Sequence, residues 1–141
     1  IQCQQKSHIM INGSCLCGKV QFQITGEPYS LSYCHCSRCR KSAGVFSAVL
    51  IGKADDLLVT TGQDHIANFE PDTDARHQRC FCKECGSSLG SLANGDVYVV
   101  AASALDDDPK LRPSVHIHTA SKPEWYEIND ELKKCEGDYI S

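Results

Sequence analysis

After Gly13, hydrophobic and polar positions mostly alternate along the chain, which is typical of strands with one buried face. Val20, Phe22 and Ile24 alternate with glutamines, and a Gly-Glu-Pro sequence beginning at Gly26 ends this segment. The pattern of hydrophobic and polar positions also predicts strands at residues 45–51, 57–61, 77–82, 97–102, 115–119 and 125–128. The sequence is therefore predicted to fold mainly as β-structure.

Helical and irregular segments are few. Residues 37–42 and 130–134 are predicted to form short helical turns, and the Asp- and Pro-containing residues 106–113 a loop. Neither a linker nor a low-complexity segment interrupts the pattern, so we expect a single domain over residues 10–141. Residues 1–9 precede Met10, which has the position of a natural start, and are expected to be an added or disordered N-terminal segment.

Length, composition and charge narrow the class of protein. The chain has 141 residues, of which 41% are hydrophobic and 23% charged, a globular balance rather than that of a disordered chain. Its formal net charge of −4 argues against a nucleic-acid partner. No apolar run approaches the roughly 18 residues of a membrane span, so no membrane segment is predicted. The first residues lack the basic and apolar regions of a secretory signal, so we expect a cytoplasmic protein with reduced thiols.

Cysteine is the residue type in clear excess, with 10 in 141 residues. Most of these cysteines fall in three tight groups: Cys15 and Cys17; Cys34, Cys36 and Cys39; Cys80, Cys82 and Cys85. A disulfide stabilises most when it closes a long loop, so disulfide frameworks usually spread their cysteines along the chain. A metal ion instead needs several thiolates within about 2.3 Å of it. The grouping therefore favours zinc sites over disulfides or ordinary buried thiols.

The number of thiolates decides how the groups can combine. A structural zinc has four ligands, whereas the second and third groups offer three cysteines each. A closed site can be assembled from cysteines of the first and third groups: Cys15, Cys17, Cys82 and Cys85. Cys34, Cys36 and Cys39 would then hold a second zinc with an open fourth position, where chemistry can occur. Cys80 is left over and could close that position instead, and the spacing leaves both arrangements open.

Other residues that could bind metal or substrate are assigned ordinary roles. His35 lies between two cysteines, but in a strand it points to the opposite face, so we predict packing or hydrogen bonding rather than metal ligation. His116 and His118 have no third ligand nearby in sequence and are predicted to be polar histidines of the surface or core. Trp125, the single tryptophan, is predicted to pack in the core, and residues 106–108 to form a solvated loop.

Basic residues gather around the second and third cysteine groups. They are Arg38, Arg40 and Lys41 after the second group, and Arg76, Arg79 and Lys83 around the third. Because four thiolates leave a zinc site with a charge of −2 and three leave −1, these cations can simply offset that charge. They can also attract a small anionic ligand, which an acidic protein would otherwise repel. The two roles are compatible.

Four segments carry a resemblance to a known family: GSCLCGKVQFQITG, YCHCSRCRKSAG, FCKECGSSL and LDDDPKLRPSVHIHTASKPEWYEI. In this order and at this spacing, from about Gly13 to Ile128, they resemble the glutathione-dependent formaldehyde-activating enzyme family, which also includes centromere protein V-like proteins. The combined cysteine pattern followed by this tail is a specific signature, whereas a single C-x-x-C would be a weak one.

The resemblance implies a fold and two zinc sites. The implied fold is a β-tent of antiparallel sheets pinned by zinc, related to that of methionine sulfoxide reductase B-type enzymes. The implied ligands of a structural zinc are Cys15, Cys17, Cys82 and Cys85. Those of a second, catalytic zinc are Cys34, Cys36 and Cys39. Two positions depart from the family pattern: Cys80 stands where a non-ligating residue is expected, and His118 where an aromatic residue is common.

The resemblance also implies an activity, the joining of formaldehyde to glutathione to give S-hydroxymethylglutathione, formally a carbon–sulfur lyase reaction in reverse. A free thiol is only about 3% ionised at pH 7, and coordination to an open zinc would deprotonate it. Arg38, Arg40 or Lys41 could hold a glutathione carboxylate. Two other functions stay open: a zinc-stabilised carrier of glutathione or another small thiol without turnover, and a zinc-stabilised protein-interaction module.

Overall fold

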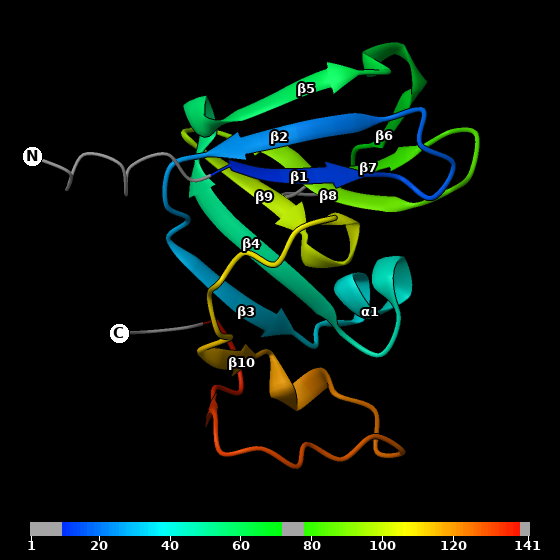
Figure 1. Cartoon of the computed structure of the whole chain (residues 1–141). Coiled ribbons are helices and arrows are strands. Elements are labelled where there is room, and N and C mark those ends of the chain that lie inside the picture. The colour runs from blue at the N-terminus through cyan, green and yellow to red at the C-terminus, as the bar shows by residue number, and fades with distance from the viewer. Residues whose placement is uncertain (1–9, 72–77, 139–141) are drawn as a thin grey trace, which may run out of the picture.

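The computed structural model describes residues 10–71 and 78–138 of the chain, and these residues form two β-sheets (Figure 1). The small sheet has three antiparallel strands in the order β1-β2-β5, which are β1 Met10–Ser14, β2 Gln21–Thr25 and β5 Leu57–Thr61. The large sheet has eight strands in the order β11-β10-β3-β4-β9-β8-β7-β6. The prediction of a mainly β fold is confirmed.

The strands of the large sheet are β3 Ser30–Cys34, β4 Ser47–Lys53, β6 Ile66–Phe69, β7 Arg79–Cys82, β8 Ser88–Asn94, β9 Val97–Ala101, β10 Val115–Ile117 and β11 Lys133–Lys134. Neighbours are antiparallel except at one edge, where β10 runs parallel to both β3 and β11. The helix α1 Ser37–Ala43 follows β3. Short 3-10 turns lie at η2 Ala54–Asp56, η3 Gln63–His65, η4 Ala102–Ala104 and η5 Thr119–Ser121.

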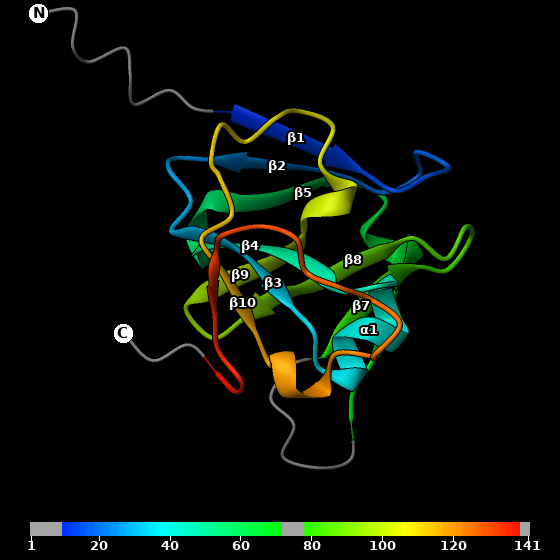
Figure 2. The ribbon, with the colours of Figure 1, turned by 90° about the horizontal axis from the view of Figure 1, so that it is seen from below.

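The core lies between the two sheets. Figures 1 and 2 show the small sheet lying over the part of the large sheet that contains β4, β8 and β9. Phe22 and Ile24 of β2 belong to the same buried cluster as Leu50 of β4 and Val100 of β9. Each of these four residues is at most 1% exposed. The alternation of hydrophobic and polar residues around Phe22 therefore marks the buried face of β2, as predicted.

Gly13 of β1 allows the ring of Phe22 to lie close to the backbone of β1 in this core. A Cβ at this position would lie 2.1 Å from the ring of Phe22. Gly13→Ala is therefore expected to displace the ring and lower the free energy of unfolding by about 1–3 kcal/mol. Urea denaturation of the metal-loaded protein measures the change. Gly137→Ala is the control, because a Cβ at Gly137 meets no atom within 4 Å; equal midpoints for the two variants would contradict the prediction.

Most predicted elements are present, with ends shifted by a few residues. The segments predicted at 45–51, 57–61, 97–102 and 115–119 correspond to β4, β5, β9 and β10, and the turn predicted at 37–42 is α1. The segment predicted at 77–82 corresponds to β7 from Arg79 onward, and residue 77 lies outside the described residues, as do residues 1–9. Strands β1, β3, β6 and β8 were not predicted, because sequences such as SLGSLAN in β8 lack a regular alternation.

Three predictions near the C-terminus are wrong. Residues 125–128 form no strand, and Trp125 lies in a turn, 73% exposed, rather than packed in the core. Residues 130–134 form no helix, since Lys133–Lys134 pair as β11 with β10. Without β11, the edge of β10 would expose unpaired backbone groups, and residues 133–134 form hydrogen bonds with them. A helix over residues 130–134 would have only about one turn, which is too short to be stable by itself.

Within the described residues, no helix has the length and apolar character needed to cross a membrane.

Candidate metal centres

Four cysteines that are distant in sequence form one cluster, which we call the four-cysteine group. Cys15 and Cys17 follow β1, Cys82 ends β7 and Cys85 lies just after it. Their Sγ atoms all lie within 4.8 Å of one another. The Sγ of Cys17 is 3.6 Å from that of Cys15 and 3.8 Å from that of Cys82. Zinc–sulfur bonds of about 2.3 Å in a tetrahedron place the sulfurs about 3.8 Å apart, so the group has the donor set and spacing of a closed zinc site.

Two tight turns hold the four-cysteine group together. The amide of Gly18 donates to the carbonyl oxygen of Cys15 at 3.0 Å, and the amide of Gly86 donates to that of Cys82 at 2.7 Å. Both glycines have left-handed φ values, 82° and 79°, which other residues adopt only with strain. The sequences CLCG and CKECG therefore place glycine where each turn needs it, and the turns bring the thiols of each pair close together.

Hydrogen bonds to sulfur favour the ionised form of two thiols in this group, those of Cys15 and Cys85. The amide of Val20 donates to the Sγ of Cys15 at 3.3 Å. The hydroxyl and the backbone amide of Ser87 lower the pKa of Cys85 to about 5. Because a zinc ligand must be a thiolate rather than a thiol, these bonds favour metal binding.

The second cluster is the three-cysteine group. Cys34 is the last residue of β3, Cys36 is the N-cap of α1, and Cys39 lies in the first turn of that helix. Their Sγ atoms lie within 4.8 Å of one another, and among the described residues no further His, Cys, Asp or Glu completes the cluster. The Sγ of Cys36 accepts a hydrogen bond from the amide of Cys39 at 3.3 Å, as an N-cap side chain does. The group thus has the donor set of a metal site with an open fourth position.

The sulfurs of the three-cysteine group differ in their affinity for protons. Hydrogen bonds with Cys34 and Cys39 lower the pKa of Cys36 far below the ordinary range of a thiol. Hydrogen bonds with Cys36 and Cys39 raise the pKa of Cys34. The Nη1 atom of Arg79 lies 3.7 Å from the Sγ of Cys39. Cys36 is therefore the first of the three to ionise, and a cation from β7 offsets part of the negative charge of the group.

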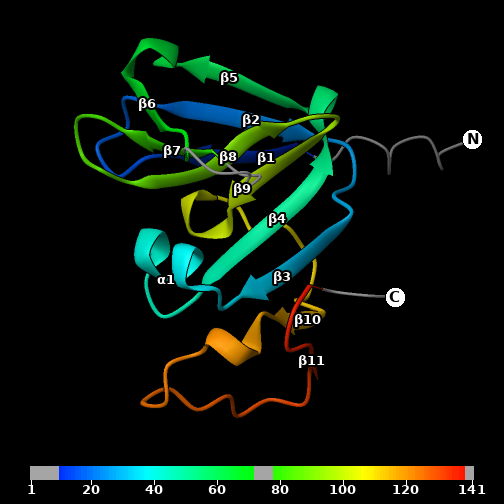
Figure 3. The same ribbon diagram turned by 180° about the vertical axis from the view of Figure 1, so that it is seen from behind.

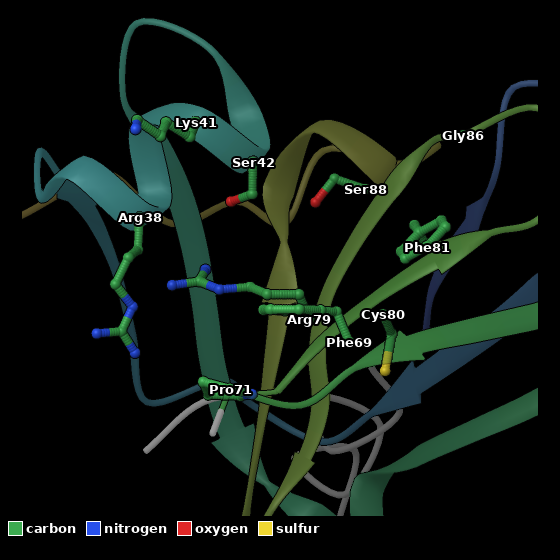
Figure 4. Close-up of a pocket in the computed structure, with 10 residues that line it drawn as sticks. All are labelled: Arg38, Lys41, Ser42, Phe69, Pro71, Arg79, Cys80, Phe81, Gly86 and Ser88. Carbon is green, nitrogen blue, oxygen red and sulfur yellow. The ribbon is translucent and has the colours of Figure 1, made fainter. Parts of the chain in front are cut away.

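Cys80 belongs to neither group. Its Sγ lies 3.5 Å from the carbonyl oxygen of Ser91 and 3.9 Å from the Oδ1 of Asn68, and the residue is 5% exposed. In Figure 4 its sulfur points away from the guanidinium of Arg79. The arrangement in which Cys80 closes the second site is therefore wrong, because contacts with the neighbouring strands β6 and β8 hold this thiol in the core.

A pocket with positively charged side chains lies beside the three-cysteine group (Figure 4). Its volume is 370 Å³. Arg38 and Lys41 line it from α1, and Arg79 extends from β7 toward that helix. The rings of Phe69 and Phe81 add apolar surface. Cations on a partly apolar wall suit a small ligand that carries a carboxylate, since a charge-assisted hydrogen bond strengthens where water is partly excluded.

Two of the three basic residues predicted to hold glutathione line this pocket. Arg38 and Lys41 are three residues apart and so share a face of α1, whereas Arg40 is not among the lining residues. Arg76 lies outside the described residues. Phe81 was not predicted as a site residue, although its place between two buried cysteines on β7 indicates that its ring faces away from the core.

His35 is buried and forms a hydrogen bond instead of joining the thiolates. Its Nε2 lies 2.8 Å from the Nδ1 of His116, and both residues are 0% exposed. The Nε2 of His116 lies in turn 2.9 Å from a carboxylate oxygen of Asp130. Burial, with His116 and then Lys122 nearby, lowers the pKa of His35 to about 4, so its ring is neutral at neutral pH. The hydrogen-bonding role predicted for His35 is confirmed.

Fold and sites together define a class of protein: a mainly β chain with a four-cysteine group and a three-cysteine group that can each hold a metal ion. The sequence profile of the glutathione-dependent formaldehyde-activating enzyme family matches residues 10–121. The chain belongs to this family, which confirms the resemblance drawn from its cysteine motifs.

Individual relatives agree with this assignment. A Halomonas elongata protein that carries the family's name is 35% identical over 141 residues, covering 93% of this chain and 89% of that one. An Aspergillus flavus protein with the same name is 38% identical over 116 residues, covering 80% of this chain but 54% of the fungal protein. Among solved structures, a Rhodobacter sphaeroides protein superposes with a TM-score of 0.56 at 22% identity, covering 69% of this chain and 89% of that one, a likeness of fold alone.

Proposed function

We propose that the protein joins glutathione to formaldehyde to give S-hydroxymethylglutathione, a carbon–sulfur lyase reaction in its reverse direction. A bond forms between the thiol sulfur and the carbonyl carbon, and the thiol proton ends on the carbonyl oxygen. The observation that supports this reaction most is the three-cysteine group, which has no fourth protein ligand among the described residues and lies beside a cationic pocket. Membership of the family supports glutathione and formaldehyde as the substrates.

The proposal assigns different roles to the two cysteine groups. The four-cysteine group would hold a structural zinc, because its ligand set is complete. A zinc ion held by Cys34, Cys36 and Cys39 would keep the thiol of glutathione ionised and in place beside formaldehyde. A site that already carries three thiolates is electron-rich, so positioning of the thiol contributes more to the rate than polarisation of the carbonyl group.

The chain's own residues would bind and orient the tripeptide. Arg38, Lys41 and Arg79 offer guanidinium and ammonium groups to a carboxylate of glutathione. Arg79 also contacts the sulfur of Cys39, so a carboxylate bound at this residue would tether glutathione close to the thiolates. Phe69 and Phe81 would shield that ion pair from water.

We also place the protein in a reducing compartment such as the cytoplasm. None of the nine cysteines in the described part of the chain forms a disulfide. Thiols kept reduced are needed both for the two metal groups and for glutathione as a thiol substrate.

Rates measured with the zinc-loaded protein test the proposed reaction. Formation of S-hydroxymethylglutathione should be faster than the spontaneous reaction and should saturate with both substrates. Glutathione that binds in native mass spectra without any acceleration would indicate a carrier instead. Absence of binding at millimolar glutathione would favour a protein-interaction module. Either of these two results would overturn the proposed reaction.

Loss of one cation from the pocket should weaken glutathione binding specifically. Arg38→Gln is expected to raise the KM for glutathione about tenfold, because a hydrogen bond to a charged group is worth about 1.5 kcal/mol. Arg40→Gln is the matched control, since Arg40 lies on the same helix but does not line the pocket. Cysteamine, a thiol without a carboxylate, should react equally with the wild type and both variants. A KM that rises equally for both arginine variants would contradict the pocket as the carboxylate site.

A further inference from the structure

A chain of hydrogen bonds connects a surface carboxylate with His35, the residue between two cysteines of the three-cysteine group. Asp130, whose side chain is 43% exposed, accepts a hydrogen bond from the Nε2 of His116 at 2.9 Å. His116 is fully buried, and its Nδ1 lies 2.8 Å from the Nε2 of His35. The three residues come from the C-terminal segment, from β10 and from the connection between β3 and α1. Figures 1 and 3 show that these elements meet at the β10 edge of the large sheet.

The carboxylate of Asp130 determines which atom donates and which accepts in each of these hydrogen bonds. A carboxylate can only accept hydrogen bonds, so the Nε2 of His116 carries the proton. In a neutral His116 the Nδ1 is then an acceptor, and His35 must donate to it from Nε2. The Nδ1 of His35 consequently holds a lone pair, and this atom is buried without a hydrogen-bond partner among the described residues. One ionised side chain at the surface thus selects the tautomer of two buried rings.

The orientation of His35 is linked to the position of two thiolates, because this residue lies between Cys34 and Cys36. Its backbone N–H donates to the carbonyl oxygen of Ile117 at 3.0 Å, which continues the pairing of β3 with β10. Its ring is nearly parallel to that of His116, with the centroids 5.0 Å apart, as expected for two rings joined edge to edge by their hydrogen bond. A ring held by this bond, on a backbone that is itself paired with β10, leaves the connection around it little freedom to move.

The rings of Phe46 and Tyr126 complete the surroundings of His35. Their centroids lie 5.0 Å and 6.1 Å from that of His35, and Tyr126 comes from the C-terminal segment that also carries Asp130. The segment after β10 therefore contacts the Cys34–Cys36 connection through both a stacked ring and a hydrogen-bonded chain. None of these residues is a ligand in either cysteine group.

We propose that Asp130, acting through His116 and His35, is a positioning residue for the three-cysteine group. The inference rests on the proposed function in one respect, namely that this group holds a metal ion. The carboxylate fixes the histidine pair, the pair fixes the Cys34–Cys36 connection, and the connection keeps two sulfurs at the spacing that one ion requires. Removal of a hydrogen-bond partner from the outer shell of a metal site typically weakens metal binding by about 10- to 100-fold.

Titration with Co²⁺ tests this role, because cobalt–thiolate absorption bands report the number and geometry of the sulfur ligands at each site. Asp130→Ala is expected to weaken Co²⁺ binding at the three-cysteine group at least about tenfold and to alter its visible spectrum. Binding at the four-cysteine group should stay unchanged. Asp130→Asn keeps an oxygen at the position of Oδ1, which lies 3.2 Å from the Nε2 of His116 and 3.0 Å from the amide nitrogen of Leu132, so it should restore most of the affinity.

The chain offers a matched control in a second histidine–aspartate pair. The Nε2 of His118 lies 2.9 Å from the Oδ1 of Asp138, but His118 is 32% exposed and Asp138 is 82% exposed. Asp138→Ala therefore removes an equivalent bond at the surface and should leave both metal sites as in the wild type.

Three results would overturn the inference. If Asp130→Ala binds Co²⁺ as Asp138→Ala does, Asp130 does not position the group, and the proposed function is unaffected. If Asp130→Ala weakens both metal sites equally, its effect is a general loss of stability. If the wild type binds a single Co²⁺, the three-cysteine group holds no metal, and the proposed function fails together with the inference.

Discussion

Replacing Cys82 with serine is expected to unfold the protein. Cys82 is 0% exposed at the end of β7, and in the four-cysteine group it meets two cysteines that follow β1. A structural zinc contributes about 10–16 kcal/mol of apparent binding free energy to folding. Native domains are stable by only about 5–15 kcal/mol, so loss of this metal removes a free energy comparable to the whole stability. Circular dichroism should show an unfolded chain, and mass spectrometry should show the loss of zinc.

Cys80→Ser is the matched control for this prediction. Cys80 is buried two residues earlier on the same strand but belongs to neither cysteine group. A serine hydroxyl can donate to the carbonyl oxygen of Ser91 as the thiol does, so this variant should stay folded and lose about 0.5–3 kcal/mol of stability. A folded Cys82→Ser with a full complement of zinc would contradict a structural role for the four-cysteine group.

Replacing Cys36 with serine is expected to abolish catalysis and leave the fold intact. One of the three sulfurs of the three-cysteine group is lost, so one metal ion per chain should disappear from native mass spectra. Serine is a better N-cap than cysteine, so the start of α1 should be preserved. The rate of S-hydroxymethylglutathione formation should then fall to that of the spontaneous reaction, while the thermal midpoint changes by only a few degrees.

Cys135→Ser controls for the loss of a thiol as such, because Cys135 belongs to neither cysteine group. It should keep two metal ions and full activity. If Cys36→Ser loses as much stability as Cys82→Ser, the division into a structural and a catalytic group is wrong. If Cys36→Ser keeps its second metal but loses activity, Cys36 acts on the substrate in another way.

Local sequence spacing predicted which cysteines lie close together, but left open whether Cys80 joins the second group. A C-x-x-C sequence closes over a turn whose glycine follows directly, so neighbouring thiols meet whatever the rest of the fold does. Counting ligands then paired Cys15 and Cys17 with Cys82 and Cys85, because four thiolates complete a zinc site and three do not. Position in the sequence offered Arg38, Arg40 and Lys41 alike as carboxylate ligands, and the structure places Arg38 and Lys41 at the pocket.

Spacing could not predict which neighbouring elements each face of a strand or a helix would contact. Cys80 is two residues from Cys82 and shares its side of β7, yet its sulfur lies near Ser91 and Asn68 because β6 and β8 flank it there. Whether Arg38 or Arg40 would line a pocket depended on where β7 lies beside α1. Trp125 is apolar, but it lies in a turn and is exposed.

The sequence by itself indicated the mainly β fold, the clusters of neighbouring thiols and the family, because alternation and ligand spacing act over a few residues and survive any later arrangement. Tertiary structure alone decided that Cys80 lies apart from the second group, that Arg79 joins Arg38 and Lys41 at one pocket, and that Asp130 reaches His35 through His116. These contacts join residues far apart in the chain. Their existence depends on strand order and on the parallel pairing of β10 with β3, which no local pattern encodes.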